Sequence, residues 1–402
     1  MSDAERRENG GACNKKAPPG GTLSSEKIML HVLDVRAIWL KEFASALARI
    51  TPTLGWIPEI SAVGALHSRE RGDSLADPKL NIRRFPLQRG FARAPVSAAL
   101  RPASKINRRL AAQSQEPSRA VLVCSSPHYA DVAKEWPGPS VYYVTDLFAA
   151  YGEKPARIEA LDRRMCAAAD LVCPNSKRIA EYLISTGCSE TKIVVIPNAT
   201  RAENVSDSPI LSPDPLPEGA ADLPRPVAGV IGNLAENIDW VLMSEVIGRT
   251  PWLSWLFVGP TDMRIAHRTQ RQARLAVMQS GRARFTGYRP YGSLRDYARA
   301  VDVAVLPYRK REPTYSGSST RFYEHLAACR PIVSTRGFEE LLSKEPLLRL
   351  VDGTAEMVDS LERLRESGFK DGLEQRRCDQ SRGETWEARA RVMLDQIGKL
   401  SL

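Results

Sequence analysis

The most informative part of the chain is the stretch Ser316-Gly-Ser-Ser-Thr-Arg-Phe-Tyr-Glu-His-Leu-Ala-Ala-Cys-Arg-Pro-Ile-Val-Ser-Thr335, in which a small-residue loop, a helix and a strand follow one another. Ser319 or Thr320 can cap the helix. The Arg330-Pro331 pair ends the helix, and the apolar residues after it predict a buried strand. A glycine- and serine-rich loop at a helix N-terminus offers unpaired backbone N–H groups to an anion.

Two charged side chains stand directly behind this loop. Arg321 and Glu324 are three residues apart, so they share one helix face. The guanidinium can neutralise a phosphate, and the carboxylate can accept hydrogen bonds from the vicinal hydroxyls of a ribose. These residues predict a site for a sugar nucleotide. The alternative is a helix-surface ion pair worth about 0.2–0.5 kcal/mol.

Length and composition limit the possible classes. A chain of 402 residues with 43% hydrophobic and 26% charged residues is typical of a globular protein with two domains. The seven cysteines include no C-x-x-C pair, which favours reduced thiols in a cytoplasmic protein and gives zinc no support. No apolar run is long enough to cross a bilayer, and residues 1–25 are interpreted as a disordered tail without a signal peptide.

The formal charge of +10 is concentrated in one place. Between Asp77 and Glu116 the chain has no acidic residue and carries Lys79, Arg83, Arg84, Arg89, Arg93, Arg101, Lys105, Arg108 and Arg109, interleaved with Phe85, Leu87, Phe91, Val96 and Leu100. This pattern favours an anionic membrane surface or a phosphate-bearing acceptor. Nucleic acid is not expected, because no binding motif for it is present. A basic solvated loop is the structural alternative.

Apolar β-rich runs alternate with helical spacing along the rest of the chain, which predicts βαβ units and parallel sheets. Before residue 203 we expect strands at 27–33, 120–124, 140–144, 170–173 and 193–196, and helices at 37–50, 129–136, 157–169 and 176–187. After residue 226 we expect strands at 227–231, 255–258, 283–285, 303–306 and 332–334, and helices at 238–249, 291–300, 320–329, 354–364 and 385–400.

The segment 203–226 holds six prolines and little apolar content, so it is interpreted as a linker between two domains. The predicted division is an N-terminal acceptor-side domain at 26–202, a nucleotide-sugar-binding domain at 227–382, and a C-terminal helix at 383–402 that packs back on the first domain. Parallel strands share one carboxyl edge, so we expect four strand ends of the second domain to converge with the loop 316–320, the serine loop, in a cleft. These strand ends are Gly232-Asn233, Gly259-Pro260, Gly287 and Pro307-Tyr308.

Six segments in this order resemble the GT-B glycosyltransferases of group-1 type, in particular a subgroup tied to bacterial surface-polysaccharide assembly. They are 169–176 (ADLVCPNS), 192–198 (KIVVIPN), 232–239 (GNLAENID), 257–260 (FVGP), 285–288 (FTGY) and 320–335 (TRFYEHLAACRPIVST). The likeness covers roughly residues 140–402. It implies two Rossmann-like parallel-sheet domains that face each other across a cleft.

The resemblance also implies roles for individual residues. Glu324 would hold the ribose hydroxyls, and the second domain would bind the donor. The diphosphate would meet the N–H groups of Ser318, Ser319 and Thr320, and the base would meet the loop of Gly287, Tyr288 and Arg289. Two departures stand out. Ser316 replaces the acid expected eight residues before Glu324, and Leu234, Ala235 and Glu236 stand where Arg and Lys are usual. Arg321 is the expected substitute cation, with Arg309 and Lys310 in reserve.

Two residues at strand ends of the first domain are candidates for chemistry. Asp146 follows the predicted strand 140–144 and could act as general base for an acceptor hydroxyl, or could be a turn or capping residue. His128 could contact the donor sugar, or cap the next helix, which we favour. No D-x-D metal motif follows a strand, so we expect no metal and no cofactor beside a UDP- or GDP-sugar donor.

These features together predict a metal-independent hexosyltransferase that uses a lipid-linked or glycan acceptor. Its expected location is cytoplasmic, with peripheral attachment to the inner membrane face left open. A sugar-nucleotide epimerase of the same fold and a non-catalytic nucleotide-sugar-binding subunit remain alternatives. A Rossmann dehydrogenase is disfavoured, because no G-x-G-x-x-G follows a strand.

Overall fold

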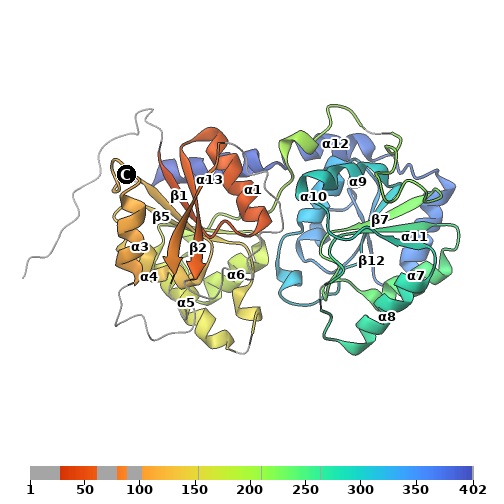
Figure 1. The fold of residues 1–402 in the computed structure, drawn as a ribbon, viewed down its shortest axis with the longest axis horizontal. Helices are drawn as coiled ribbons and strands as arrows, with labels where there is room; N and C mark the ends of the chain where they lie inside the picture. Colours follow the sequence, from red (N-terminus) through yellow and green to blue (C-terminus); the bar gives the residue numbers. More distant parts are fainter. Residues whose placement is uncertain are drawn as a thin grey trace, which may run out of the picture.

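The computed structural model describes residues 28–60, 79–87, 102–152, 154–209, 211–262 and 264–400. Two α/β domains lie side by side along the long axis of the molecule (Figure 1). The first contains a six-stranded parallel sheet with the order β3-β2-β1-β4-β5-β6. Its strands are β1 (Leu30–Leu33), β2 (Thr53–Ile60), β3 (Asn81–Leu87), β4 (Val121–Cys124), β5 (Ser140–Val144) and β6 (Leu171–Pro174).

The second domain repeats this architecture. Its sheet has the order β12-β11-β10-β7-β8-β9, and all its pairs are parallel. The strands are β7 (Val227–Ile231), β8 (Ser254–Val258), β9 (Ala283–Phe285), β10 (Val303–Leu306), β11 (Ile332–Thr335) and β12 (Arg349–Val351). Both sheets therefore have the doubly wound Rossmann order, with switch points between β1 and β4 and between β7 and β10. The predicted fold class is confirmed.

Helices cover both faces of each sheet, so the central strands are buried on both sides and read as continuous apolar runs. The helices that begin before residue 203 are α1 (Ile38–Ile50), α3 (Pro102–Ala111), α4 (Ala130–Glu135), α5 (Pro155–Ala168) and α6 (Lys177–Ser185). The later helices are α7 (Trp240–Arg249), α8 (Arg268–Gln279), α9 (Leu294–Ala300), α10 (Thr320–Ala327), α11 (Thr354–Glu366), α12 (Glu374–Arg382) and α13 (Trp386–Lys399).

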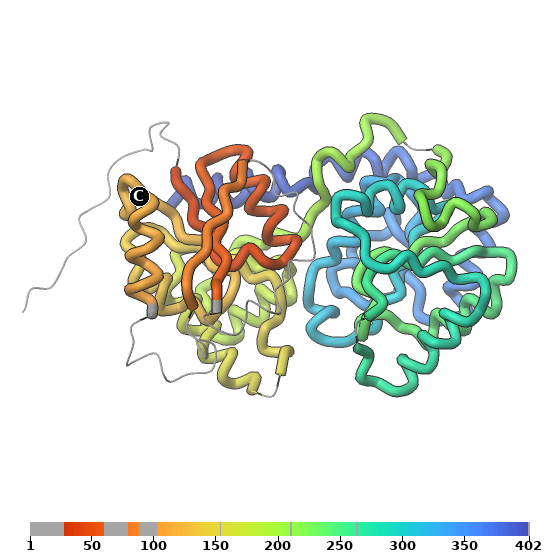
Figure 2. Tube along the Cα trace, viewed as in Figure 1, coloured from red at the N-terminus to blue at the C-terminus, as the bar shows by residue number. Residues whose placement is uncertain are grey.

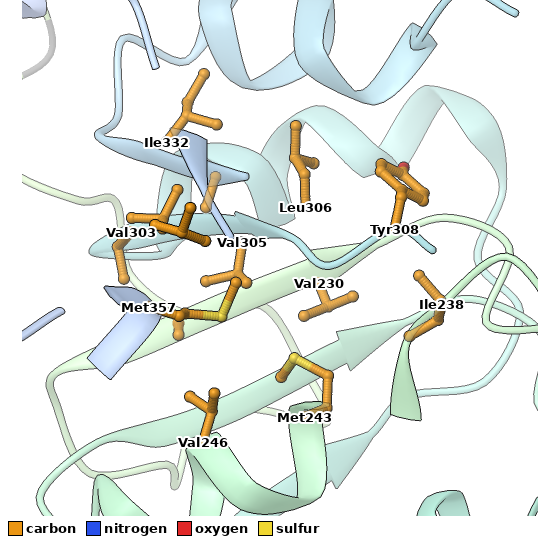
Figure 3. Close-up of a cluster of buried hydrophobic side chains, with 14 of the residues drawn as sticks. Val230, Ile238, Met243, Val246, Val303, Val305, Leu306, Tyr308, Ile332 and Met357 are labelled. Carbon is orange, nitrogen blue, oxygen red and sulfur yellow. The ribbon is translucent and has the colours of Figure 1, made fainter. Parts of the chain in front are cut away.

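The core of the second domain forms where its central strands meet α7 and α11. Val230, Val305, Met243 and Met357 are fully or almost fully buried and point into one apolar layer (Figure 3). Burying aliphatic and thioether side chains of this size stabilises the fold by about 1.5–3 kcal/mol each. This layer fixes the carboxyl ends of β7 and β10, which carry the site residues.

The chain returns to the first domain at its C-terminal end (Figure 2). Trp386 and Met393 of α13 belong to the same buried cluster as Phe43 of α1 and Tyr143 of β5. The ring centroids of Phe43 and Trp386 are 6.2 Å apart. Helix α13 thus completes the core of the first domain, although it follows the second domain in sequence.

The proline-rich segment is packed on the second domain. Asp214 accepts a bond of 2.8 Å from Arg299 Nε, and Asp302 accepts one of 2.9 Å from Arg225 Nη1. Ala220 is fully buried in a cluster with Val227 and neighbouring residues of the second domain. Residues 211–226 therefore have a defined path over this domain.

Several predicted elements were wrong or missing. The run 193–196 is not a strand, although it follows β6 through Val194 N–H to Val172 O (3.0 Å) and Ile196 N–H to Pro174 O (2.8 Å). Strand β2 was missed because a proline and a glycine interrupt its pattern. Helix α8 was missed because its residues are mostly polar, and β12 and α12 were missed as well.

The basic segment is not simply a solvated loop, because its described parts include β3 and α3. Phe85 is fully buried against Trp56 and Tyr129, so this aromatic ring is unavailable to a membrane. Arg83 and Arg84 are exposed on β3, at the edge of the sheet. Arg89, Arg93, Arg101, Phe91, Val96 and Leu100 lie outside the described residues.

In the described parts of the chain, no helix has the length and apolar character needed to span a bilayer.

Candidate functional site

A cleft of about 650 Å³ lies between the two domains, at the carboxyl edges of both sheets. The first domain contributes Trp39, Asp146 and Asn198 to its walls. The second domain contributes Asn233, the serine loop and Arg321. Ligands of doubly wound folds bind at this edge, where the strand order reverses. The cleft therefore unites the residues that the sequence placed on two separate sheets.

The serine loop enters α10 as predicted, and Ser319 is its N-cap. The Ser319 side chain accepts a bond of 3.3 Å from the Phe322 N–H. The Ser319 N–H itself donates to Glu340 Oε2 (2.9 Å). We expected this N–H to meet a diphosphate, but in the structure Glu340 already accepts its hydrogen bond. The N–H groups of Thr320 and Arg321 have no acceptor among the described residues, so they remain for a ligand at the helix N-terminus.

Ser318 joins the two domains instead of standing free in the cleft. Its Oγ accepts from the Asn198 N–H (3.0 Å) and donates to Glu340 Oε1 (3.1 Å), and its carbonyl accepts from Asn198 Nδ2 (2.8 Å). Asn198 Oδ1 is buried and finds no partner among the described residues.

Arg321 lies directly over Gly232 at the end of β7. Gly232 has φ +127°, and a Cβ built there would lie 2.3 Å from Arg321 Nε. Only glycine fits, because any side chain would displace the guanidinium. Arg321 Nη1 is buried without a described partner, and the side chain lines the cleft. Asn233 thus lines the cleft, and the close approach at the neighbouring Gly232 is made by Arg321.

Glu324 is buried rather than part of an exposed ion pair, which corrects the surface alternative. Its residue exposure is 5%. Its Oε1 accepts from the Tyr291 hydroxyl and its Oε2 from Asn204 Nδ2 (3.1 Å). Burial raises the pKa of Glu324, and the Tyr291 bond and Arg321 oppose that shift. Glu324 does not line the cleft described above, and its ribose contact stays a prediction.

The predicted base loop is at the end of β9. Gly287 has φ +71°, and its carbonyl accepts a bond of 3.0 Å from the Gly259 N–H. Tyr288 is 38% exposed, and the Arg289 guanidinium lies against Gly219 of the proline-rich segment. These three loop residues share the carboxyl edge of the sheet, but they do not line the cleft described above.

Asp146 faces the cleft from the end of β5. Burial raises the pKa of Asp146 to about 6, and a hydrogen bond from the Tyr151 hydroxyl opposes this shift. The turn that follows begins at Leu147 and has no side-chain cap, so Asp146 is not a helix-capping residue. A carboxyl group with a pKa near neutrality suits proton transfer.

His128 is not brought into the cleft. Its Nδ1 lies 3.0 Å from Ser126 Oγ, and the ring is half-buried in the turn before α4. Ser126 rather than His128 caps this turn, since its side chain accepts from the His128 N–H. The expectation that His128 contacts the donor sugar has no geometric support in the described residues.

The cleft residues that were not predicted include four with polar or charged side chains: Tyr151, Arg264, Arg311 and Glu312. Arg264 follows β8, and the other two second-domain residues follow β10, so their position after parallel strands was an available signal. No sequence pattern indicated Tyr151, because its hydrogen bond to Asp146 depends on the turn between these two residues. Within the described residues, no group of three or more His, Cys, Asp or Glu could hold a metal ion.

Comparisons with known proteins agree with this architecture. The family model described as "Glycosyltransferase Family 4" matches residues 61–204, and "Glycosyl transferases group 1" matches residues 225–367. No curated protein matches the chain in sequence.

Many solved structures share the fold. Anabaena HepE, in complex with UDP and glucose, is 13% identical and superimposes with a TM-score of 0.67 over 93% of this chain and 100% of its own. A Rickettsia africae glycosyltransferase is 12% identical, with a TM-score of 0.69 over 94% and 99%. The lipopolysaccharide outer core galactosyltransferase WaaB is 12% identical, with a TM-score of 0.59 over 92% and 99%. With one family model on each domain and this shared fold, the chain belongs to the group-1 glycosyltransferases of GT-B type.

Proposed function

We propose that this protein transfers a sugar from a nucleotide diphosphate sugar to a lipid-linked or polysaccharide acceptor in bacterial surface or exopolysaccharide assembly. The observation that carries the proposal is the cleft itself. One wall carries the N-terminus of α10 and Arg321, whose Nη1 has no hydrogen-bond partner among the described residues, and the other wall carries Asp146 with its raised pKa. The cation and the helix N-terminus suit a diphosphate, and the carboxyl group suits an acceptor hydroxyl.

The donor half of the proposal rests on α10. The N–H groups of Thr320 and Arg321 and the Arg321 guanidinium offer hydrogen bonds and positive charge to a diphosphate. Arg264 and Arg311 add cations at the same cleft. UDP is preferred over GDP as the nucleotide, because HepE, which has this fold, was solved with UDP and glucose.

The chemical half rests on Asp146. In its ionised form this carboxylate would take the proton of the acceptor hydroxyl as that oxygen attacks the anomeric carbon. The bond from the anomeric carbon to the diphosphate would break, and Arg321 with the α10 N-terminus would stabilise the departing charge. This arrangement gives inversion at the anomeric carbon and needs no bound metal ion.

The acceptor half rests on the first domain. Arg83 and Arg84 are exposed on β3 and belong to the basic segment 77–116, which fits an anionic membrane that presents a lipid-linked acceptor. WaaB, which shares the fold, is a lipopolysaccharide outer core galactosyltransferase. We infer a protein that works at the cytoplasmic face of the membrane.

Thermal unfolding with a panel of UDP, GDP and NAD tests the donor class. Stabilisation by UDP or GDP, but not by NAD, supports the proposal, and a shift with NAD alone contradicts it. Release of the nucleotide from the matching nucleotide sugar, at an unchanged rate in a metal chelator, separates a metal-independent transferase from a binding subunit. Appearance of an epimeric sugar nucleotide would favour an epimerase.

A further inference from the structure

Three carboxylates among the described residues line the cleft: Asp146, Glu236 and Glu312. Two of them have a role. Asp146 is the proposed base. Glu236 accepts from the Ala266 N–H (2.8 Å), close to the start of α8, and forms ion pairs with Arg311 (3.3 Å) and Arg309 (3.7 Å). Glu312 is the cleft carboxylate that these roles leave unexplained.

Glu312 is held against the serine loop by Ser316. The Ser316 hydroxyl donates to Glu312 Oε1 (2.8 Å), and the Ser316 N–H donates to Oε2 (3.2 Å). Ser316 itself is 2% exposed, so it cannot contact a ligand in the cleft. The Glu312 side chain is 36% exposed. These two bonds therefore hold the Glu312 carboxylate at the cleft, although Ser316 itself is buried.

The first domain holds the same group from the other side. Arg178 Nε lies 3.4 Å from Glu312 Oε1 and 3.0 Å from Ser316 Oγ, and its guanidinium lies over the Tyr315 ring at 5.1 Å. Ser176 Oγ donates to the Ser316 carbonyl. A carboxylate has about four acceptor positions, and the bonds from Ser316 and Arg178 use three of them. One position on Oε2 remains.

We propose that Glu312 binds a hydroxyl of the donor sugar, an inference that rests on the proposed function. A diphosphate at the N-terminus of α10 places its sugar next to the preceding loop, and the cleft wall there is formed by Glu312, Pro313 and Thr314. Asp146 and Tyr151 form the wall contributed by the first domain. A pyranose between these walls offers hydroxyl donors, and Glu312 Oε2 is the acceptor that meets them.

Calorimetric titration of Glu312→Gln tests this assignment. The probes are UDP-glucose, UDP-galactose, UDP-N-acetylglucosamine and GDP-mannose, each compared with UDP or GDP alone. We expect the Kd of the best nucleotide sugar to rise about 10- to 100-fold, the range for a hydrogen bond to a charged group, while the Kd of its nucleotide stays unchanged. Glu366→Gln is the matched control, because Glu366 is exposed at the end of α11.

Arg178→Gln separates sugar binding from closure of the domains. It removes the ion pair and keeps the carboxylate, so we expect less than about a threefold change in the Kd of the nucleotide sugar. If Arg178→Gln matches the loss in Glu312→Gln, Glu312 acts only through the contact between domains and the assignment is overturned. Equal affinity of Glu312→Gln and wild type for the nucleotide sugar overturns it too. Failure of wild type to bind any nucleotide would instead reject the proposed function, and this inference with it.

Discussion

The two sheets have the same strand order, yet their carboxyl edges are built differently. In the second domain, β7 and β8 lead directly into Gly232 and Gly259, whose φ angles of +127° and +151° suit glycine. In the first domain, β1, β4, β5 and β6 are followed by residues with polar side chains, namely Asp34, Ser125, Thr145 and Asn175. The edge of the second domain allows close approach of neighbouring groups to the backbone at Gly232 and Gly259, and the edge of the first domain carries polar side chains.

This difference suggests a division of labour on one scaffold. A glycine edge allows the backbone and Arg321 to approach a phosphate group. A side-chain edge supplies an acid with a tuned pKa, as at Asp146. We therefore expect substitutions in the first domain to change turnover or acceptor delivery and to spare nucleotide binding. Substitutions at α10 should weaken nucleotide binding. Each experiment below can contradict this division between the two domains.

The largest effect is expected for Asp146→Asn, which removes the proposed base. Turnover should fall on the order of 10²–10⁴-fold while the Kd of UDP stays unchanged. In wild type the ionised form is active, so kcat/KM should rise with pH up to about 6 and then level off. Asp131→Asn is the control, since Asp131 pairs with Arg164 on the surface. A near-normal rate, or a product of retained configuration, would return Asp146 to a structural role.

The next effect concerns the basic segment. Each cation at an anionic bilayer contributes about 1 kcal/mol, so Arg83, Arg84, Arg89 and Arg93 changed together to Gln should weaken vesicle binding by up to about 10³-fold. Co-sedimentation with anionic and neutral vesicles measures this, and high salt should mimic the change.

The control for charge removes four exposed arginines from the second domain: Arg268, Arg282, Arg363 and Arg376. This variant should keep its vesicle binding, and both variants should bind UDP normally. If wild type sediments equally with anionic and neutral vesicles, the basic segment is not a membrane surface.

A smaller effect is expected at Glu324. Glu324→Ala would leave the Tyr291 hydroxyl and the Asn204 amide without their acceptor, so loss of stability would obscure binding. Glu324→Gln keeps a side-chain oxygen and removes the charge. We expect UDP to bind about 10-fold more weakly to a folded Gln variant, measured by calorimetry with a thermal unfolding control. Unchanged affinity would remove Glu324 from the nucleotide site.

The sequence predicted the second domain better than the first, for physical reasons. Strands β7 and β10 are fully buried, so they appear as short apolar runs with the predicted bounds. Strand β2 contains Gly55 and Pro58, which resemble turn residues, and its role in the sheet depends on pairing with β1 and β3. Strand β3 lies at the edge with exposed arginines, so its pattern resembled a charged loop.

The site was predicted only where local sequence determines it. The Ser319 cap and the position of Arg321 follow from the loop and helix alone. The buried state of Glu324 depends on Asn204, and the place of Ser316 depends on Ser176, which is 140 residues away. Glu340, which accepts the hydrogen bond of the Ser319 N–H, belongs to a turn after β11. Contacts between distant segments leave no periodic signal, so the sequence could not show which polar groups were already satisfied.

The smallest effect is on the stability of the first domain. The folded state raises the pKa of Asp146 from 3.8 to about 6, so between these values it binds more protons than the unfolded chain. The free energy of unfolding of wild type should therefore fall as pH rises from about 4 to 6, because ionisation of a buried carboxyl is costly. A shift of this size corresponds to at most about 3 kcal/mol, and partial exposure reduces the expected value to about 1 kcal/mol. Asp146→Asn should lack this fall and be more stable than wild type at pH 7 by that amount, with no difference at pH 4. Urea unfolding at both pH values measures it, and an Asn variant that is less stable at pH 7 would show that the carboxylate holds the fold instead of serving the cleft.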